Sequence, residues 1–333
     1  MDHLHYIYSA IPNRAPLSLA SNLHVFAVLY LEHWDFEAPE GSVRDPRFVG
    51  EFGSFNPDYR SWTQREYGLR IGVFRIIEAL LEAGIQPVVA ANSLVLPRVP
   101  QLLQTLKDAN AEWLGHGMAA TRLMHANMPL KEQREHIASS LAALQTATGE
   151  SPKGWVSQDW GTSPHTFGLL ADAGVRYTLD WGNDDQAYWM LPAGNSQQSL
   201  LALPMSSEWD DVQGQWFRPV EPSQHAARMM QAAEQMRNEC QAHQRAAVMG
   251  LGLHPWCDVF GLIADRLFDR HLFQVASARG GLDGRFWCWR FVVGGCPQDG
   301  DFYFRVAPVG VSFGVADDGL GGQCLQAQSP LQG

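Results

Sequence analysis

The sequence predicts an α/β fold in which parallel strands form a barrel with helices outside it. Short apolar runs alternate with helical patterns from about residue 24 to residue 273, and this alternation is typical of a parallel sheet. Roughly seven strands over about 250 residues match the size of a single-domain (β/α) barrel. Each predicted strand is followed by a polar or ionisable residue, as in barrels whose active site lies at the C-terminal ends of the strands.

The predicted strands are short and apolar. The first, residues 25–31 (VFAVLYL), is a continuous apolar run of strand length. Further strands are predicted at residues 87–91, 112–115, 154–158, 176–181, 200–204 and 247–253.

Helices are predicted between these strands. Residues 69–83 carry apolar side chains at helical spacing and end at Gly84, a natural C-terminal stop. A long amphipathic segment ends in the same way at Gly149, and Ser163 is suited to cap the helix that follows it. The other segments with a helical pattern are residues 99–110, 130–148, 163–173 and 222–244.

The alternation stops near residue 273, which divides the chain into two parts. We predict a (β/α) barrel domain over residues 1–272 and an irregular C-terminal tail over residues 273–333. The tail is rich in glycine, and its one strand-like stretch, residues 286–291 (FWCWRF), has no place in the alternation. We interpret the tail as poorly ordered or as the product of a reading-frame change, with a small appended β element as the alternative.

Composition excludes several classes of partner. The formal net charge is −11, whereas nucleic acid and anionic membranes recruit basic patches. No apolar run approaches the length of a membrane span, and the N-terminus lacks the basic start and apolar core of a secretory signal. We therefore expect a cytoplasmic protein that binds neither nucleic acid nor membrane, with a small molecule as its substrate.

The residues after the predicted strands are the candidates for an active site. Hydrolysis of an amide or ester needs a base that activates water, a group that stabilises the oxyanion and an acid for the leaving group. We assign Glu32 as base or metal ligand and His254 as general acid, because imidazole titrates near neutral pH. His116 lies between two glycines that allow close approach of substrate. Each has a structural alternative. Glu32 would be an exposed glutamate, His116 would be bound to a loop carbonyl, and His254 would be fixed by packing.

Five segments resemble motifs of one known superfamily. They are Glu66-Tyr67-Gly68-x-Arg70-x-Gly72-x-x-Arg75, Gly115-His116-Gly117, Thr148-Gly149-x-x-Pro152-x-Gly154-Trp155, Leu169-Leu170-Ala171-x-Ala173-Gly174-Val175-x-Tyr177-x-x-Asp180 followed by Asn183-Asp184-Asp185, and Leu253-His254-Pro255. Over about residues 20–272 the chain resembles the polysaccharide deacetylase (NodB-homology) superfamily, and within it the branch of metal-independent, deacetylase-like allantoinases. The resemblance implies a deformed (β/α)7-type barrel, a metal-ligand role for His116 and a general-acid role for His254.

The metal ligands of the superfamily are only partly present. Typical metal-dependent members carry a pair of aspartates after the first strand, where this chain has Glu32-His33, and a second histidine four residues after the first, where it has Ala120. A catalytic zinc site needs about three protein ligands, and Glu32 and His116 supply two. We therefore assign no cofactor, with a divalent metal such as zinc held by Glu32 and His116 as the open alternative.

The resemblance and the strand-end residues together predict a hydrolase of carbon–nitrogen bonds other than peptide bonds, acting on a small amide, cyclic ureide or N-acetyl group. The alternatives are a metal-dependent carbohydrate deacetylase and a non-catalytic carbohydrate- or metabolite-binding barrel. Since members of the superfamily often assemble, we expect a homo-oligomer of undefined size. The predicted catalytic residues are Glu32, His116, Asp180 and His254, and the predicted substrate-binding residues are His33, Trp34, Arg75, Asn92, Gln158, Asp159, Trp181, Asp184, Asp185, Glu208 and Asp210.

Overall fold

The computed structural model describes most of the barrel region. Residues 22–37, 57–191, 199–218 and 220–258 are described, with shorter pieces at 5–6, 10, 39–40 and 42 and the backbone of three strands closer to the C-terminus. Among the described residues, no helix combines the length and the apolar composition that crossing a bilayer requires.

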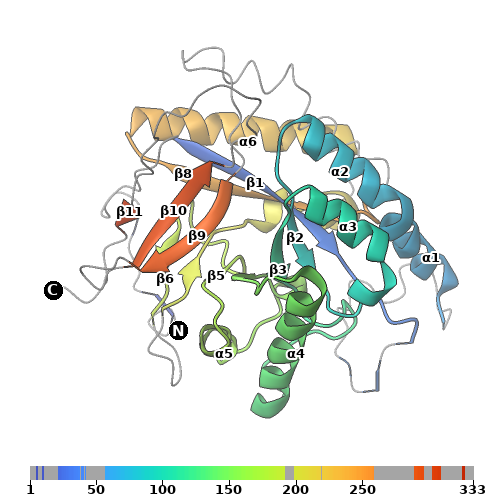
Figure 1. Ribbon diagram of the computed structural model, residues 1–333. Coiled ribbons are helices and arrows are strands. Elements are labelled where there is room, and N and C mark those ends of the chain that lie inside the picture. The colour runs from blue at the N-terminus through green and yellow to red at the C-terminus, as the bar shows by residue number, and fades with distance from the viewer. Residues whose placement is uncertain are drawn as a thin grey trace.

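The core of the fold is an eight-stranded sheet in the order β6-β7-β5-β4-β3-β2-β1-β8. Neighbouring strands run parallel, except that β6 pairs antiparallel with β7 at one edge. The sheet curls into a deformed barrel with helices outside it (Figure 1), which confirms the predicted fold class. The strands are β1 (Leu23–Leu31), β2 (Val88–Ala91), β3 (Glu112–Gly115), β4 (Gly154–Trp155), β5 (Tyr177–Thr178), β6 (Tyr188–Trp189), β7 (Leu201–Ala202) and β8 (Ala247–Leu253).

Side chains of β1 alternate between two cores, as the period of a strand requires. Phe26, Val28 and Tyr30 pack inside the barrel with apolar residues of the other strands. Leu29 and Leu31, with Ala27, pack outside the sheet against the helices. Residue 32, the next even position, therefore faces the barrel interior.

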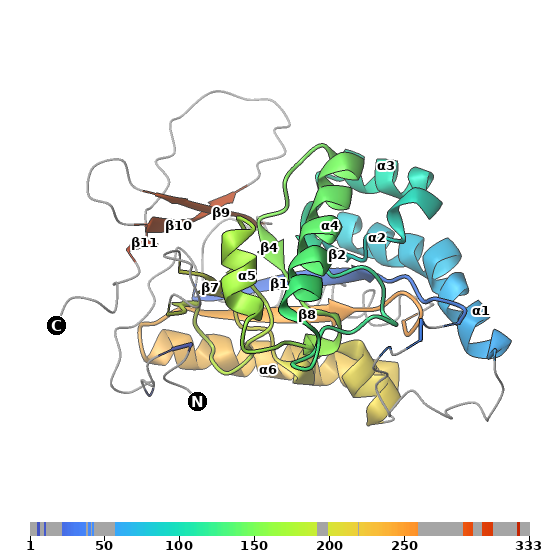
Figure 2. The same cartoon turned by 90° about the horizontal axis from the view of Figure 1, so that it is seen from below.

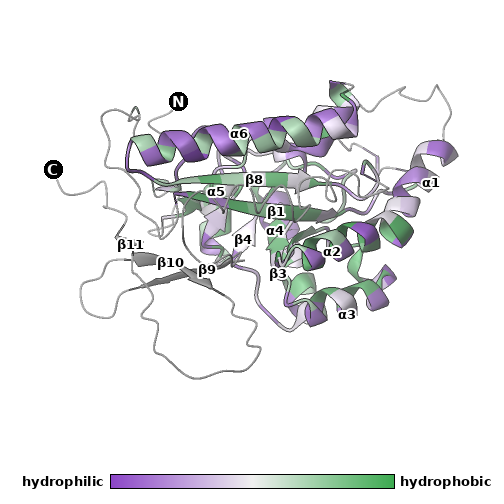
Figure 3. Cartoon of the chain, turned by 90° about the horizontal axis from the view of Figure 1, so that it is seen from above, coloured by the Kyte–Doolittle hydropathy of each residue, from purple (hydrophilic) through white to green (hydrophobic). Residues whose placement is uncertain are grey.

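The helices cover the outer face of the sheet. They are α1 (Tyr59–Tyr67), α2 (Val73–Glu82), α3 (Pro100–Asp108), α4 (Leu130–Thr148), α5 (Thr166–Asp172) and α6 (Pro222–Ala242). Helix α6 runs along β8 and β1, as Figures 2 and 3 show from opposite sides, with its hydrophilic residues turned outward. Its Ala226 and Met229 join the outer core with Ile76 and Leu80 of α2.

The segment before β2 is longer and less regular than the single helix predicted over residues 69–83. Helix α1 is followed by a π-helix, Gly68–Gly72, and then by α2. A Cβ atom on Gly68 would lie 2.5 Å from the backbone nitrogen of Trp256. Glycine at this position therefore lets the helix lie directly against the loop after β8, where π-turns often mark functional sites.

Four strands differ from the prediction in detail. The predicted strands over residues 154–158, 176–181 and 200–204 are each reduced to two residues, in β4, β5 and β7. The edge strand β6 was not predicted, because two residues are too few to show a period in the sequence.

Three further strands lie within residues 273–333. Strands β9 (Trp289–Gly295), β10 (Phe302–Pro308) and β11 (Leu325–Gln326) form an antiparallel sheet separate from the eight-stranded one. Strand β9 overlaps the stretch that looked strand-like in the sequence. The proposed division at residue 272 lies outside the described residues and stays a prediction.

Candidate active site

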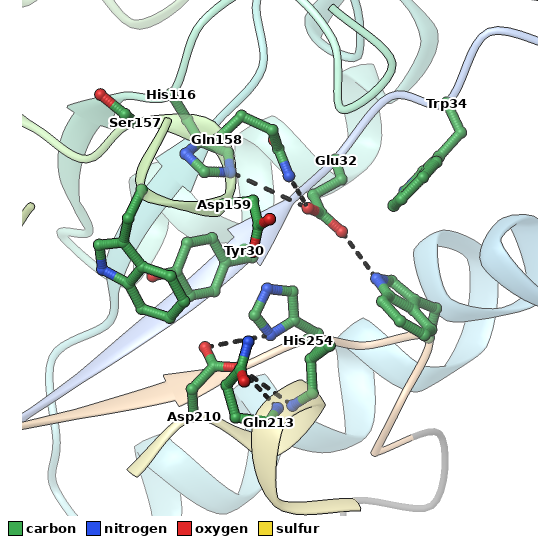
Figure 4. Close-up of a pocket in the computed structure, with 13 residues that line it drawn as sticks. Tyr30, Glu32, Trp34, His116, Ser157, Gln158, Asp159, Asp210, Gln213 and His254 are labelled. Atoms are coloured by element: carbon green, nitrogen blue, oxygen red, sulfur yellow. Dashed lines mark hydrogen bonds and ion pairs between the residues drawn. The ribbon is translucent and has the colours of Figure 1, made fainter. Parts of the chain in front are cut away.

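A pocket opens at the C-terminal ends of the parallel strands. It encloses about 410 Å³ of space without protein atoms, part of it open to solvent. Residues of β1 and of the loops after β1, β3, β4, β7 and β8 converge on it (Figure 4). Its walls are Tyr30, Glu32, Trp34, His116, Ser157, Gln158, Asp159, Trp160, Asp210, Val212, Gln213, His254 and Trp256.

The alternation of the strands explains which strand-end residues reach the pocket. Each of the main polar side chains comes two residues after a position that faces the barrel interior, so it continues the inward row. In strand order the pairs are Tyr30 and Glu32, Ala90 and Asn92, Leu114 and His116, and Val156 and Gln158. His254 continues the corresponding row of β8, which begins with the inward-facing Val248.

Glu32 is almost fully buried and is held by two N–H donors. Gln158 Nε2 donates to its Oε1 at 2.6 Å, and Trp256 Nε1 donates to its Oε2 at 2.7 Å. Burial by itself raises the pKa of Glu32, but the close approach of His116 and the nearby charge of His254 outweigh it and lower the pKa to about 2. The carboxylate is therefore ionised at neutral pH.

His116 presents one ring nitrogen to the pocket. Its Nδ1 lies 2.8 Å from the carbonyl oxygen of Val156, a contact in which only a protonated Nδ1 can donate. Its buried Nε2 has no hydrogen-bond partner among the described residues and lies 3.9 Å from Glu32 Oε1. In the neutral ring this nitrogen carries a lone pair directed toward Glu32.

Asn92 fixes the orientation of Gln158 without lining the pocket. Its Nδ2 donates to the carbonyl of His116 at 2.5 Å and to Gln158 Oε1 at 3.3 Å, while its Oδ1 accepts from the backbone of His33 at 2.9 Å. With its oxygen bound to Asn92, the Gln158 amide turns its NH2 group toward Glu32. The predicted substrate-binding residues Asn92 and Gln158 thus act on Glu32.

His254 faces Glu32 from the opposite wall of the pocket (Figure 4). Asp211 accepts from His254 Nδ1 at 2.6 Å and from its backbone nitrogen at 2.7 Å. Burial lowers the pKa of His254, but the carboxylates of Asp210 and Asp211 outweigh it and raise the pKa to about 10. The imidazolium ring stacks on Tyr30 with centroids 4.1 Å apart, which fixes its plane.

Asp210 lies beside this ion pair. Its Oδ1 accepts from the backbone nitrogens of Val212 at 3.1 Å and Gln213 at 3.2 Å. Its Oδ2 is 3.7 Å from His254 Nδ1, outside hydrogen-bond distance. Burial, more than the neighbouring charges, raises the pKa of Asp210 to about 6.

Aromatic residues and a strained turn form the rim. The Arg65 guanidinium stacks 3.6 Å from the ring centroid of Trp34, which meets Trp256 edge to face at 6.2 Å. On the far side Asp159 and Trp160 both have left-handed backbone, with φ of 48° and 52°. Consecutive residues in this region cost energy and cluster at functional sites.

Three predicted site residues point away from the pocket. Asp180 accepts from the backbone and hydroxyl of Ser157 at 2.6 and 2.8 Å, and burial raises its pKa to about 6. His33 follows the outward parity of β1 and lies between Arg98 and Asp35. Arg75 donates to Tyr67 on the outside of the barrel.

Four other predicted residues also lie outside the pocket walls. Trp181 packs against Phe167 with ring centroids 5.5 Å apart. Asp184 accepts from the backbone of Gln186, Asp185 accepts through its carbonyl from Val248, and Glu208 pairs with Arg218 at the surface. Seven of the fifteen predicted site residues line the pocket: Glu32, Trp34, His116, Gln158, Asp159, Asp210 and His254.

Sequence reasoning missed Tyr30, Ser157, Val212, Gln213 and Trp256 of the pocket walls, and it missed Asp211, which holds His254. Tyr30 lies inside β1, where residues were expected only to pack, yet its ring lies between His116 and His254. Trp256 comes two residues after His254, so the spacing that places His254 could have identified it. No feature of the sequence marks Gln213.

The residues present do not fit a zinc ion of the kind that the superfamily uses. Glu32 and His116 supply two ligand atoms, but both Glu32 oxygens already accept from N–H donors. The position of the missing histidine is Ala120, whose backbone binds the carbonyl of His33. Asp210, Asp211 and His254 also bring ligand atoms within 4.8 Å of one another. There, however, Nδ1 of the histidine carries the proton that it donates to Asp211.

Comparison with family models gives no match, and comparison with curated protein sequences gives none. Solved structures do match. A crystal structure of PuuE allantoinase is 22% identical, covers 78% of this chain and 85% of its own, and has a TM-score of 0.64. A probable polysaccharide deacetylase from Pseudomonas aeruginosa PAO1 is 20% identical, covers 78% of this chain and 86% of its own, and has a TM-score of 0.62. The chain thus has the deformed barrel fold of these proteins.

Proposed function

We propose that the chain is a hydrolase of carbon–nitrogen bonds other than peptide bonds, acting on a small amide, cyclic ureide or N-acetyl group. The observation that carries the proposal is an acid and a base on opposite walls of one pocket. The acid is His254, protonated between carboxylates, and the base is the His116–Glu32 pair. The size of the pocket suits a small molecule.

The His116–Glu32 pair activates water. A carboxylate with a pKa of about 2 is a weak base, and an efficient base has a pKa near the working pH. A water molecule between His116 Nε2 and Glu32 Oε1 would give its proton to the imidazole. The resulting imidazolium faces the Glu32 carboxylate 3.9 Å away, which stabilises the new charge.

His254, on the opposite wall, protonates the leaving group. Because Asp211 binds Nδ1 of His254, Nε2 is the ring nitrogen that donates to a bound substrate. Protonation matters most for nitrogen, since an amide nitrogen is a poor leaving group until it gains a proton. The names of the two similar structures, an allantoinase and a probable polysaccharide deacetylase, support this class of reaction.

Turnover of a panel of carboxamides, cyclic ureides and N-acetyl sugars tests the proposal. We expect hydrolysis of at least one class, with kcat/KM about 10²- to 10⁴-fold lower in His254→Gln and in Glu32→Gln. His165→Gln, at an exposed position outside the pocket, is the matched control. Full activity in either pocket variant, or no turnover of any compound, contradicts the proposal.

A further inference from the structure

Asp210 is a buried acidic residue of the pocket with one oxygen unpaired. The side chain belongs to a residue that is only 1% exposed, and two backbone N–H groups hold its Oδ1. Its Oδ2 has no hydrogen-bond partner among the described residues, and the residue lines the pocket beside His254 (Figure 4). A buried carboxylate oxygen without a donor is unfavourable unless a ligand supplies one.

The orientation of His254 does not depend on this oxygen. Asp211 alone accepts from both the ring and the backbone of His254. Asp210 Oδ2 lies 3.7 Å from the same ring nitrogen and forms no hydrogen bond with it. This oxygen acts on His254 through its charge only, so its capacity to accept a hydrogen bond is available for a molecule in the pocket.

The fold also leaves room for the carboxylate. A Cβ atom on Gly252 would lie 2.3 Å from Asp210 Oδ2, so any other residue at 252 would displace it. The carboxylates of Asp210, Asp211 and Glu32 surround the single imidazolium of His254. The excess of negative charge around His254 therefore attracts an N–H donor or a cation.

We propose that Asp210 Oδ2 accepts a hydrogen bond from an N–H group on the leaving nitrogen of the substrate and, when the substrate is a carboxamide, holds the released amine as an ammonium ion. The inference rests on the proposed function and narrows its substrate class. Substrates are carboxamides or ureides whose leaving nitrogen carries at least one hydrogen. Esters and amides with a fully substituted nitrogen lack that donor and bind poorly.

The reaction balances without a proton on Asp210. Water forms the new carbon–oxygen bond and gives a proton to the His116–Glu32 pair. The carbon–nitrogen bond breaks as nitrogen takes the bonding electrons and the proton of His254. With a carboxamide the released amine then takes the proton of the new carboxylic acid, and the products are a carboxylate and an ammonium ion. With a ureide the released nitrogen stays a neutral urea N–H group, and the carboxylic acid gives its proton to solvent. In both cases the proton on the base returns to His254 through solvent, and Asp210 accepts hydrogen bonds throughout.

Binding of methylammonium tests the proposal without turnover. The full chain is titrated with methylammonium and, separately, with tetramethylammonium, which has the same charge but no N–H; fluorescence of the pocket tryptophans reports binding. We expect saturable binding of methylammonium that is about tenfold or more weaker in Asp210→Asn. Asp172→Asn, an exposed acidic residue at the end of α5, serves as control and should bind like the unaltered chain. Tetramethylammonium should bind at least tenfold more weakly to the unaltered chain, a comparison that needs no variant to fold.

A kinetic comparison then separates the inference from the proposed function. For an amide and an ester with the same acyl group, Asp210→Asn removes one of the charges that keep His254 protonated in both reactions, but it should lower kcat/KM of the amide about tenfold or more beyond any loss for the ester. If no compound is hydrolysed, the proposed function fails while the binding test still decides the role of Asp210. Equal binding of the two ammonium ions, an unchanged methylammonium affinity in Asp210→Asn, or equal loss for amide and ester overturns the inference. Displacement of methylammonium by micromolar zinc also overturns it, because the three-residue cluster would then be a metal site.

Discussion

Asp211→Asn tests how the protein keeps His254 protonated. The substitution preserves the shape of the side chain but removes the charge that Nδ1 contacts at 2.6 Å. A hydrogen bond to a charged group contributes about 1.5–3 kcal/mol, and one pKa unit corresponds to about 1.4 kcal/mol. The pKa of His254, about 10 in the unaltered protein, should therefore fall by roughly 1–2 units.

The assay is the pH dependence of kcat/KM, with an NMR titration of the His254 ring as a readout that needs no substrate. Because the acid must be protonated, the alkaline limb should move from about pH 10 toward roughly pH 8–9 in Asp211→Asn. Asp172→Asn should leave the limb in place. An alkaline limb that stays near pH 10 in Asp211→Asn would refute the assignment of His254 as the acid held by Asp211.

The same shift predicts how stability depends on pH. The pKa of His254 is higher in the folded protein than its usual value of 6.5, so folding favours the protonated ring. The stabilisation is fully present below about pH 6.5 and is lost as the pH rises through about 10. In Asp211→Asn the free energy of unfolding, measured with urea, should lose part of this slope between pH 7 and pH 10.

Three further outcomes follow from the contacts of the site. Asn92→Ala leaves Gln158 Oε1 and the carbonyl of His116 without their donor, so kcat/KM should fall about tenfold or more. Unchanged kinetics would contradict the role of Asn92 in orienting Gln158 toward Glu32. Gly68→Ala places a Cβ atom 2.5 Å from the Trp256 backbone and should lower the free energy of unfolding in urea by about 1–3 kcal/mol; an unchanged midpoint would show that the helix can shift. Turnover should survive dialysis against a chelator, because Glu32 is already held by N–H donors, and loss that zinc restores would contradict this.

Much of the fold could be predicted from the sequence because its two longest barrel strands are almost entirely apolar. Strands β1 and β8 bury nearly all of their residues and pair along most of their length, so each shows as an apolar run. The two-residue edge strand β6 leaves no such pattern and was not predicted. The break between α1 and α2 depends on close packing of Gly68 against a loop nearly two hundred residues away, which no local pattern reveals.

The site was predicted less completely, because strand ends were treated as a class without regard to the direction of each side chain. On β5, Tyr177 and Leu179 face the interior, so Asp180 faces outward and binds Ser157, itself one residue after the inward-facing Val156. The same rule turns His33 away from Glu32. On β1, β3 and β4 the residue that follows an inward position by two reaches the pocket, whereas Asn92 after β2 and Trp181 after β5 do not line it, so side-chain direction narrows the candidates without selecting them completely.

The acid and the base of the pocket are linked electrostatically, and this limits what any single variant can show. The charge of His254 is among the causes that lower the pKa of Glu32, and Glu32 is among the causes that raise the pKa of His254. Glu32→Gln therefore removes the carboxylate that faces His116 and also lowers the pKa of His254, so both limbs of its pH profile should move. Asp211→Asn should move the alkaline limb further than the acid limb, because Asp211 contacts His254 directly. The relative movement of the two limbs in these variants, more than the loss of activity in either, distinguishes an acid–base pair from two residues that only bind substrate.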